Sequence, residues 1–391
     1  MAAAKMNTSA NAMRYTHQKI KGVFEKKYHP KTVAIIGWLG AFNLGDEMML
    51  NVSMHKLIRR GDKLTILTYK KDAAVEKRYE GFKVISRRPL TRQDVREVVE
   101  TNDSLLVNGG ALIDDRYYTS TGSLARDIAK LAHSFIAAGK PVVVYGISAN
   151  TNLKNKQLIN DYKRVVEGAA HFSMRDDFSR DEMNRHFDAS KIEIVDDIVF
   201  ADETLIQKPV ILPGRTIISV IAVLDKNTID HVKRFFDYLT SATEASIKFI
   251  SFYDENYNDA KYIEEIKNYL GDRRMRIDEI SSPINSADLF NALLPSDIVF
   301  SMRYHGSLVA NAMGKKVITI DYDKHPHYFN KNKYLQDHYG FSTASFKLTD
   351  IESMSIDDIR RFIDHTAPTE VDIKSINSRA RADLIKALNL L

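Results

Sequence analysis

Two neighbouring segments in the second half of the chain carry residues suited to chemistry on an anionic substrate. Arg303 and His305 follow an apolar run at residues 298–300, and Lys324 follows a second apolar run at residues 317–320. Arginine offers a planar fork for an anion, lysine offers a point charge, and histidine titrates near neutral pH. This set of groups suits a small substrate that carries both a carboxylate and a phosphate.

The elements around these residues predict how they are positioned. Both apolar runs have the character of buried strands, and residues 307–313 read as a short helix that Gly314 would close. In an open α/β sheet, ligands bind in the loops beyond the carboxyl ends of neighbouring strands. We therefore expect Arg303, His305 and Lys324 to meet at one rim of a sheet, with Arg303 and His305 in a loop ahead of the helix.

A glycine-rich segment lies between a predicted strand at residues 32–36 and a predicted helix. It contains Gly37, Gly40 and Gly45. Such a segment can cradle a phosphate at the helix N-terminus, or it can be a structural tight turn. Its spacing matches neither the dinucleotide-binding fingerprint nor the phosphate-binding loop of nucleotide hydrolases, so both interpretations stay open.

Strand and helix patterns alternate along the chain and predict an α/β fold with mostly parallel sheets. One strand is expected at residues 104–107, with a loop at residues 108–110. Pro209, Pro213 and Gly214 interrupt the pattern and indicate a domain boundary. We predict two Rossmann-like domains facing each other across a cleft, which is the GT-B arrangement. The predicted parts are a partly disordered lead (1–31), an N-terminal domain (32–208), a C-terminal domain (209–368) and a final helix that packs back on the first domain (369–391).

Composition excludes several classes of protein. The 391 residues include no cysteine, which excludes disulfides, thiolate zinc sites and a cysteine nucleophile. The 56 basic residues nearly balance the 51 acidic ones, which argues against a nucleic-acid binder. No window has the roughly 20 apolar residues of a membrane-spanning helix. The basic segment at residues 19–31 is compatible with peripheral membrane contact at most, and we expect a cytoplasmic protein.

Several motifs, taken in order, resemble the polysaccharide pyruvyl transferase family over roughly residues 33 to 340. They are Gly40-x-x-Asn43-x-Gly45-Asp46-Glu47, Asn108-Gly109-Gly110-Ala111-Leu112-Ile113-Asp114, Ser173-x-Arg175-Asp176 with Ser179, Ser301-x-Arg303-x-His305-Gly306, and Tyr322-Asp323-Lys324. The chain departs from the family at Ala111, where a third glycine is common. It departs again at residues 147–150, where the family has a glycine-rich turn.

The resemblance implies a GT-B enzyme of exopolysaccharide or cell-wall glycan synthesis, working in the cytoplasm and at most at the inner face of the membrane. Such an enzyme transfers the pyruvyl group of phosphoenolpyruvate to two sugar hydroxyls, forms a pyruvate ketal and releases phosphate. The resemblance implies neither a metal nor another cofactor.

Site residues carry over by position in the motifs. The catalytic set is His305, Arg303 and Lys324, and the phosphoenolpyruvate-binding set is Arg175, Arg303, His305 and Lys324, mainly on the C-terminal domain. The acceptor set is Asn43, Asp46, Glu47, Asn108, Gly109, Gly110 and Asp114, on the N-terminal domain. The sugar, its attachment to a nucleotide or lipid, and the oligomeric state are left open.

Other interpretations of the same residues stand beside this one. Arg175 could instead form an internal ion pair, and Asp46 and Glu47 could cap a helix. Asp321 and Asp323 have the spacing with which some glycosyltransferases bind a metal. The rival functions are a GT-B glycosyltransferase that uses a nucleotide sugar and a non-catalytic protein that binds a glycan or an anion.

Overall fold

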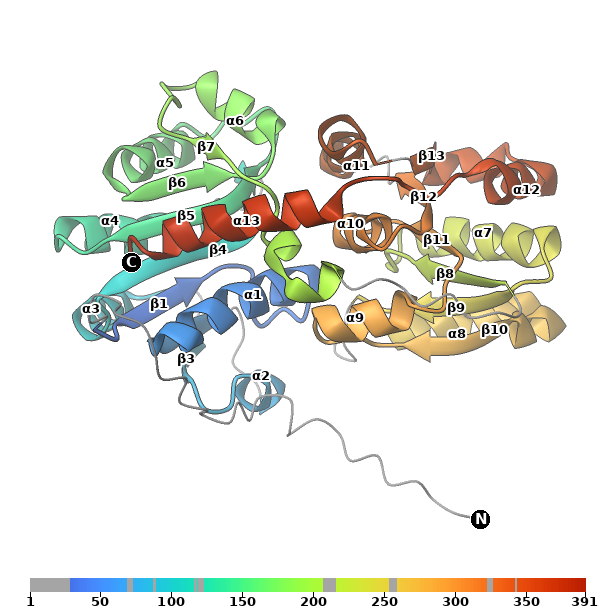
Figure 1. Cartoon of the computed structure of the whole chain (residues 1–391), viewed down its shortest axis with the longest axis horizontal. Coiled ribbons are helices and arrows are strands. Elements are labelled where there is room, and N and C mark those ends of the chain that lie inside the picture. The colour runs from blue at the N-terminus through green and yellow to red at the C-terminus, as the bar shows by residue number, and fades with distance from the viewer. Residues whose placement is uncertain are drawn as a thin grey trace, which may run out of the picture.

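The computed structural model describes residues 29–68, 73–86, 89–115, 118, 123–206, 216–252, 259–321, 326–341 and 343–391. Residues 1–28 of the predicted lead lie outside the described residues, as do residues 207–215 around the predicted boundary. The described chain forms two parallel sheets with helices packed around them, side by side along the long axis of the molecule (Figure 1).

The first sheet has seven strands in the order β3-β2-β1-β4-β5-β6-β7. They are β1 (Thr32–Ile36), β2 (Lys63–Thr68), β3 (Lys83–Ser86), β4 (Ser104–Ile113), β5 (Val142–Ala149), β6 (His171–Met174) and β7 (Glu193–Ile194). The strand order reverses between β1 and β4, and the loops beyond this switch point are where a doubly wound sheet binds ligands.

The second sheet repeats this topology with six strands in the order β10-β9-β8-β11-β12-β13. They are β8 (Ile217–Ile221), β9 (Ser246–Ile250), β10 (Ile277–Ser281), β11 (Ile298–Ser301), β12 (Lys316–Asp321) and β13 (Thr343–Lys347). Its switch point lies between β8 and β11, so the strand that precedes Arg303 and His305 stands at the position where ligands are expected.

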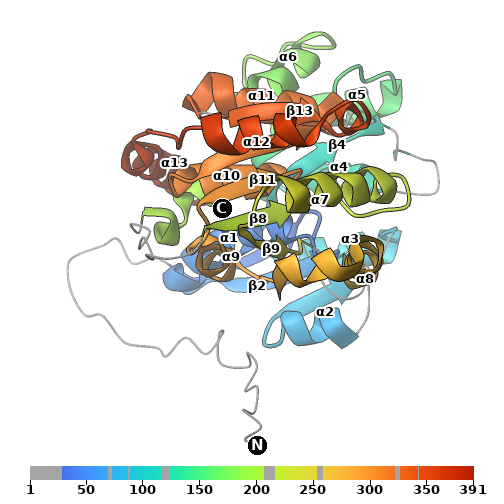
Figure 2. The same ribbon diagram turned by 90° about the vertical axis from the view of Figure 1, so that its right-hand side faces the viewer.

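Helices cover both faces of each sheet, as Figure 2 shows for the second one. In the first half they are α1 (Leu44–Arg60), α2 (Ala73–Arg78), α3 (Arg92–Thr101), α4 (Leu124–Ala137), α5 (Lys156–Gly168) and α6 (Asp177–Asn184). In the second half they are α7 (Ile229–Ala242), α8 (Asp259–Leu270), α9 (Ser286–Leu293), α10 (Tyr304–Ala312), α11 (Pro326–Tyr339), α12 (Ile356–His365) and α13 (Ile373–Leu388).

One hydrophobic core is shared by the two halves. It joins buried residues of β1 and α1, such as Val33 and Leu50, to residues of β11 and α10, such as Val299 and Leu308. Two further cores lie on the opposite faces of the sheets, one beneath α3, α4 and α5 and one beneath α7, α8 and α12. A continuous apolar interior therefore fixes how the two halves meet.

The last helix, α13, crosses from the second half and lies along the first (Figure 1, red). The Asn377 amide donates to the backbone carbonyls of Phe200 and Asp202 at 2.6 and 2.9 Å. Arg379 forms a bidentate ion pair with Asp196 at 2.7 and 3.0 Å. These contacts bind α13 to the segment that follows β7. No helix in the described part of the chain is both long and apolar enough to cross a bilayer.

We predict that the protein loses stability as the pH falls below about 6.5 through the titration of His171. Burial lowers the pKa of His171 from that ordinary value, although Glu193 acts in the opposite direction. The unfolded chain then binds a proton on this residue at a pH where the folded chain does not, so acidification favours unfolding.

Urea unfolding at pH 7.5 and pH 5.5 tests the role of His171. His171→Phe keeps the apolar contact with Tyr145, whose ring stacks on the imidazole, and is expected to reduce the stability lost between the two values. His365→Phe, at an exposed position on α12, is the control that keeps the full loss. An unchanged pH dependence in His171→Phe would contradict the prediction.

Candidate active site

His305 is placed by the first turn of α10. The helix begins at Tyr304 with Arg303 as its N-cap residue, so His305 lies in the helix and not in the predicted loop ahead of it. The reason is local packing: a Cβ on Gly306 would lie 2.7 Å from atoms of both Ile221 and Ser301, and glycine lets the helix start directly against the strands. The imidazole is thereby held close to the carboxyl end of β11.

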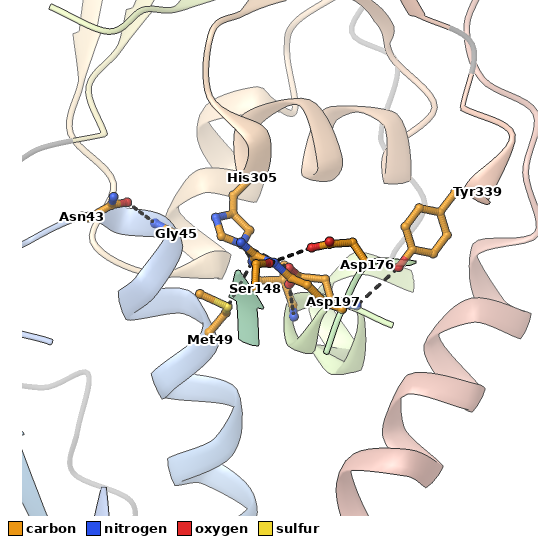
Figure 3. Close-up of polar contacts among 10 residues, drawn as sticks. Asn43, Gly45, Met49, Ser148, Asp176, Asp197, His305 and Tyr339 are labelled. Carbon is orange, nitrogen blue, oxygen red and sulfur yellow. Dashed lines mark hydrogen bonds and ion pairs between the residues drawn. The ribbon is translucent and has the colours of Figure 1, made fainter. Parts of the chain in front are cut away.

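The first turn of α10 meets the first turn of α1 from the other half (Figure 3). A Cβ built on Gly45 would lie only 2.0 Å from Nδ1 of His305, so this contact needs a glycine. Beside it, the backbone N–H of Leu44 donates to the carbonyl of Phe252 across the junction at 3.0 Å. The residues that follow β1 and those that follow β11 are therefore in direct contact.

A buried cluster of Arg175, Asp197 and His305 lies at this junction. Nη1 of Arg175 donates to Oδ2 of Asp197 at 2.7 Å, and Nε2 of His305 lies 3.4 Å from the same oxygen. Nη1 of Arg175 also lies 3.3 Å from Nε2 of His305. Arg175 and Asp197 follow β6 and β7, so the first half contributes the ion pair and the second half contributes the imidazole.

The electrostatics of the pair keep both groups ionised near neutral pH. Burial by itself raises the pKa of the Asp197 carboxyl, but Arg175 and His305 outweigh this effect and hold the pKa far below its usual range. Burial likewise acts to lower the pKa of Arg175, while Asp197 raises it above its ordinary value. Each charge thus stabilises the other in a site that excludes water.

Arg175 keeps part of its guanidinium available. Its Nε donates to Ser148 at 2.9 Å, and the group lies 4.9 Å from the ring centre of Tyr304, a cation–π contact. Within the described residues, Nη2 donates to no protein atom. An arginine has five N–H groups, so Arg175 can hold Asp197 and still offer a hydrogen bond to an anion.

One interpretation of the sequence was that Arg175 forms an internal ion pair. In the structure it forms that ion pair with Asp197. The neighbouring Asp176 has a different role: it accepts the hydroxyl of Ser148 at 2.7 Å and caps α6 through the N–H of Ser179 at 2.8 Å. The structure brings together Arg175 and His305, which the sequence assigned to donor binding.

The remaining predicted donor residues are only partly described. Arg303 is largely buried, and its backbone N–H donates to Ser301 Oγ at 3.2 Å. Lys324 lies outside the described residues, and so does Asp323. Asp321, the other acid of the possible metal-binding pair, is buried and accepts from Asn332 at 2.7 Å.

Several predicted acceptor residues have structural partners. Asn43 caps α1 by accepting the N–H of Gly45 at 3.0 Å. Both carboxylate oxygens of buried Glu47 lie within 2.8 Å of the Tyr79 hydroxyl. With the N–H groups of Leu44 and Gly45 already occupied, the geometry favours a structural turn over a phosphate cradle at this helix.

The segment Asn108–Gly110 is part of β4, whereas the sequence predicted a loop there. The strand runs on through Gly109 and Gly110, which have positive φ values of 47° and 89° that glycine adopts without strain. A Cβ on Gly110 would lie 3.0 Å from a carboxylate oxygen of Asp46, so two predicted acceptor positions are neighbours.

The other acceptor positions of this strand differ in their surroundings. Asn108 is buried, and its Oδ1 accepts a hydrogen bond from the Ser53 hydroxyl at a distance of 2.5 Å. Asp114 follows the strand at a half-buried position.

Sequence reasoning missed Asp197 and Ser148 as members of the site. Ser148 lies at the carboxyl end of β5 and Asp197 comes shortly after β7, so the position of each at the end of an apolar strand pattern was the signal that could have found them. Nothing in their spacing from Arg175 or His305 indicated contact.

Comparison with solved structures defines the class of fold. A glycosyltransferase from Rickettsia africae matches 93% of this chain and 96% of its own, with a TM-score of 0.55 and 13% identity. A UDP-GlcNAc 2-epimerase from Neisseria meningitidis, bound to UDP-GlcNAc, matches 92% and 100%, with a TM-score of 0.54 and 13% identity. MurG from Acinetobacter baumannii matches 92% and 95%, with a TM-score of 0.50 and 10% identity. The predicted GT-B fold is confirmed.

The sequence defines the family within this fold. The family model for polysaccharide pyruvyl transferase matches residues 43–324, which is more than half of the chain. The protein belongs to the polysaccharide pyruvyl transferase family, as the motifs predicted. No curated protein sequence matches it.

We predict that Gly45→Ala displaces His305, because the added Cβ would lie 2.0 Å from Nδ1. Overpacking of this kind costs roughly 1–3 kcal/mol, and the imidazole signals in a histidine NMR spectrum should shift. Gly168→Ala is the matched control, since its Cβ would meet side-chain atoms of Ile136, the nearest at 2.9 Å, far from His305 in the chain. Unchanged His305 signals in Gly45→Ala would contradict the assigned contact.

Proposed function

We propose that the protein transfers the pyruvyl group of phosphoenolpyruvate to two hydroxyls of a sugar in a glycan or glycan precursor. The observation that carries this proposal is the meeting of Arg175 and His305 at the junction of the two halves, in a member of this family. A guanidinium and an imidazole within 3.3 Å of each other can bind one anion and serve its proton transfers.

The reaction needs proton transfers and charge stabilisation. The C3 methylene carbon of phosphoenolpyruvate gains a proton, and the oxygen of one sugar hydroxyl bonds to C2 and loses its own proton. The C2–O bond to phosphate then breaks, and phosphate leaves with the electron pair. The second hydroxyl attacks C2 and loses its proton, which closes the ketal. Of the two hydroxyl protons, one balances the proton given to C3 and the other leaves with phosphate.

Residues of the site can be matched to these needs. His305 carries a proton to C3 or from a hydroxyl, since imidazole is the side chain best suited to both directions near neutral pH. Arg303, with Nη2 of Arg175, binds the carboxylate and phosphate, and we expect Lys324 to add a further charge. The N-terminus of α10 lies at the same place, and its partial positive charge favours an anion.

The acceptor binds, in this proposal, on the half that carries α1 and β4. Asp46 precedes the neighbouring Glu47 in the first turn of α1, and Asp114 directly follows β4, so we assign both carboxylates to sugar hydroxyls. Asn43, Glu47 and Asn108 shape the surface around them through their contacts with Gly45, Tyr79 and Ser53. A sugar hydroxyl placed there would face the anion held by Arg175 and His305.

The decisive experiment incubates the protein with phosphoenolpyruvate and a library of free, nucleotide-linked and lipid-linked sugars. Phosphate release that depends on an acceptor, with the mass gain of a ketal on that acceptor, supports the proposal. Release of a nucleoside diphosphate from a nucleotide sugar, with no use of phosphoenolpyruvate, would replace it with a glycosyltransferase. Binding of a glycan or an anion without turnover would make the protein a binding protein.

We predict different consequences for Arg303 and His305, at the start of α10. His305→Ala should lower kcat about 10²–10⁴-fold, the range for a positioned acid or base. His305→Gln should restore donor binding better than it restores rate, since glutamine hydrogen-bonds but transfers no proton. Arg303→Ala should mainly raise KM for phosphoenolpyruvate, because a buried anion loses its partner. Near wild-type turnover by His305→Gln would move the acid–base role to another group.

We further predict that turnover needs no divalent metal, because cationic side chains can offset the charge of the leaving phosphate. The measurement compares phosphate release before and after treatment with a chelator. Activity that is lost with the chelator and restored by manganese would contradict this prediction and direct attention to Asp321 and Asp323.

A further inference from the structure

We propose that Asp197 is a positioning residue that holds His305 against Arg175 across the junction of the two halves. The inference rests on the proposed function, because it assigns to Asp197 the orientation of the group that transfers the proton. Asp197 itself is not assigned contact with the substrate.

Contacts to both carboxylate oxygens hold the side chain of Asp197 in one orientation. Oδ2 receives Arg175 Nη1 at 2.7 Å and lies 3.4 Å from Nε2 of His305, while Oδ1 accepts the N–H of Val199 at 3.0 Å. Its own N–H donates to the hydroxyl of Tyr339 in α11 at 3.3 Å. The residue is 0% exposed, so no water competes for these positions. A carboxylate fixed in this way can fix the ring that it touches.

The two ring nitrogens of His305 have different surroundings. Nε2 faces Asp197 and Arg175, and Nδ1 faces Gly45 at the closest approach of the two helices. The ring is therefore held between a charged pair on one side and the backbone of α1 on the other. Without Asp197, Nε2 would face only the positive charge of Arg175, which repels a protonated imidazole.

Asp197 also reduces the positive charge with which the site attracts phosphoenolpyruvate. The ion pair makes the combined charge of Arg175 and Asp197 zero, so Arg175 attracts an anion less than an isolated arginine would. A change that removes the carboxylate charge should leave donor binding intact or strengthen it while it weakens catalysis. A purely structural role predicts that binding and catalysis fail together.

The neighbouring Asp196 provides a matched control. It lies in the same segment, is 3% exposed and also pairs with an arginine, yet its partner is Arg379 of α13 and not a residue of the site. Asp196→Asn therefore disturbs the same segment and removes the same charge without touching His305.

The kinetic test compares Asp197→Asn with Asp196→Asn, using phosphoenolpyruvate and an accepted sugar. Asp197→Asn should lower kcat about 10²-fold, the loss expected from a misplaced catalytic group, with KM for phosphoenolpyruvate unchanged or lower. Asp196→Asn should keep kcat within a few-fold while lowering Tm. Equal loss of kcat in the two variants, or a raised KM in Asp197→Asn with kcat retained, would overturn the proposal.

A second measurement depends neither on turnover nor on the folding of Asp197→Asn. Nitrogen NMR of labelled histidine in the wild-type protein, with the signal assigned by its absence in His305→Gln, reports which ring nitrogens carry a proton. The proposal expects a proton on Nε2, because the Asp197 carboxylate that faces this nitrogen can only accept a hydrogen bond. An Nε2 without a proton, which is the state that accepts from Arg175, would overturn it. If no acceptor supports phosphate release, the proposed function fails, and this measurement still decides whether Asp197 orients His305.

Discussion

The buried charge of Arg175 is the constraint on which the junction of the two halves depends. An ionised guanidinium that is only 2% exposed needs a partner, and loss of the partner of a buried ion pair typically costs about 3–5 kcal/mol. Asp197 supplies that partner. The Ser148 hydroxyl accepts a hydrogen bond from Nε of Arg175, and the ring of Tyr304 packs against the guanidinium. These contacts join the ends of β5, β6 and β7 to α10 of the other half, so one charge organises both sides of the site.

Glycines shape the same junction by their lack of a side chain. Gly45 admits the imidazole of His305, and Gly109 admits Met49, whose sulfur would lie 2.5 Å from an added Cβ. Met49 in turn contacts Nη1 of Arg175 at 3.7 Å. Glycines at the end of a strand are often taken as a cradle for phosphate, yet here Gly45, in α1, and Gly109, in β4, make room for protein side chains. The close approach that glycine allows is between the two halves of the protein.

The sequence predicted much of the fold for a simple physical reason. Runs such as those of β1, β8 and β11 are mostly apolar because a parallel strand covered on both faces has no polar side, and such runs are easy to recognise. Predictions were weaker where the local pattern was ambiguous. The start of α10 was placed too late because Tyr304 and His305 do not look like the first turn of a helix. The strand β4 was ended too early because Gly109 and Gly110 usually end strands.

The candidate site was predictable in its parts but not in its contacts. Arg175 and His305 stood out by residue type and position after a strand, and the structure brings them within 3.3 Å. Asp197 did not stand out, because an acidic residue after a strand is common and its partners lie far away in the sequence. Contacts of this kind depend on how two sheets are placed relative to each other, and no local pattern encodes that placement.

Two consecutive acids, Asp196 and Asp197, connect the site to the outside of the molecule. Asp197 faces inward to Arg175 and His305, while Asp196 faces the last helix and pairs with Arg379. The helix α13 follows the second half in the sequence but packs on the first, so the pair of Asp196 with Arg379 lies within the first half. The contact of Asp197 with His305 joins the two halves, and a rotation of one half against the other would strain it. Asp196 and Arg379 fix the segment that carries Asp197, and Asp197 can then hold the imidazole of one half beside the guanidinium of the other.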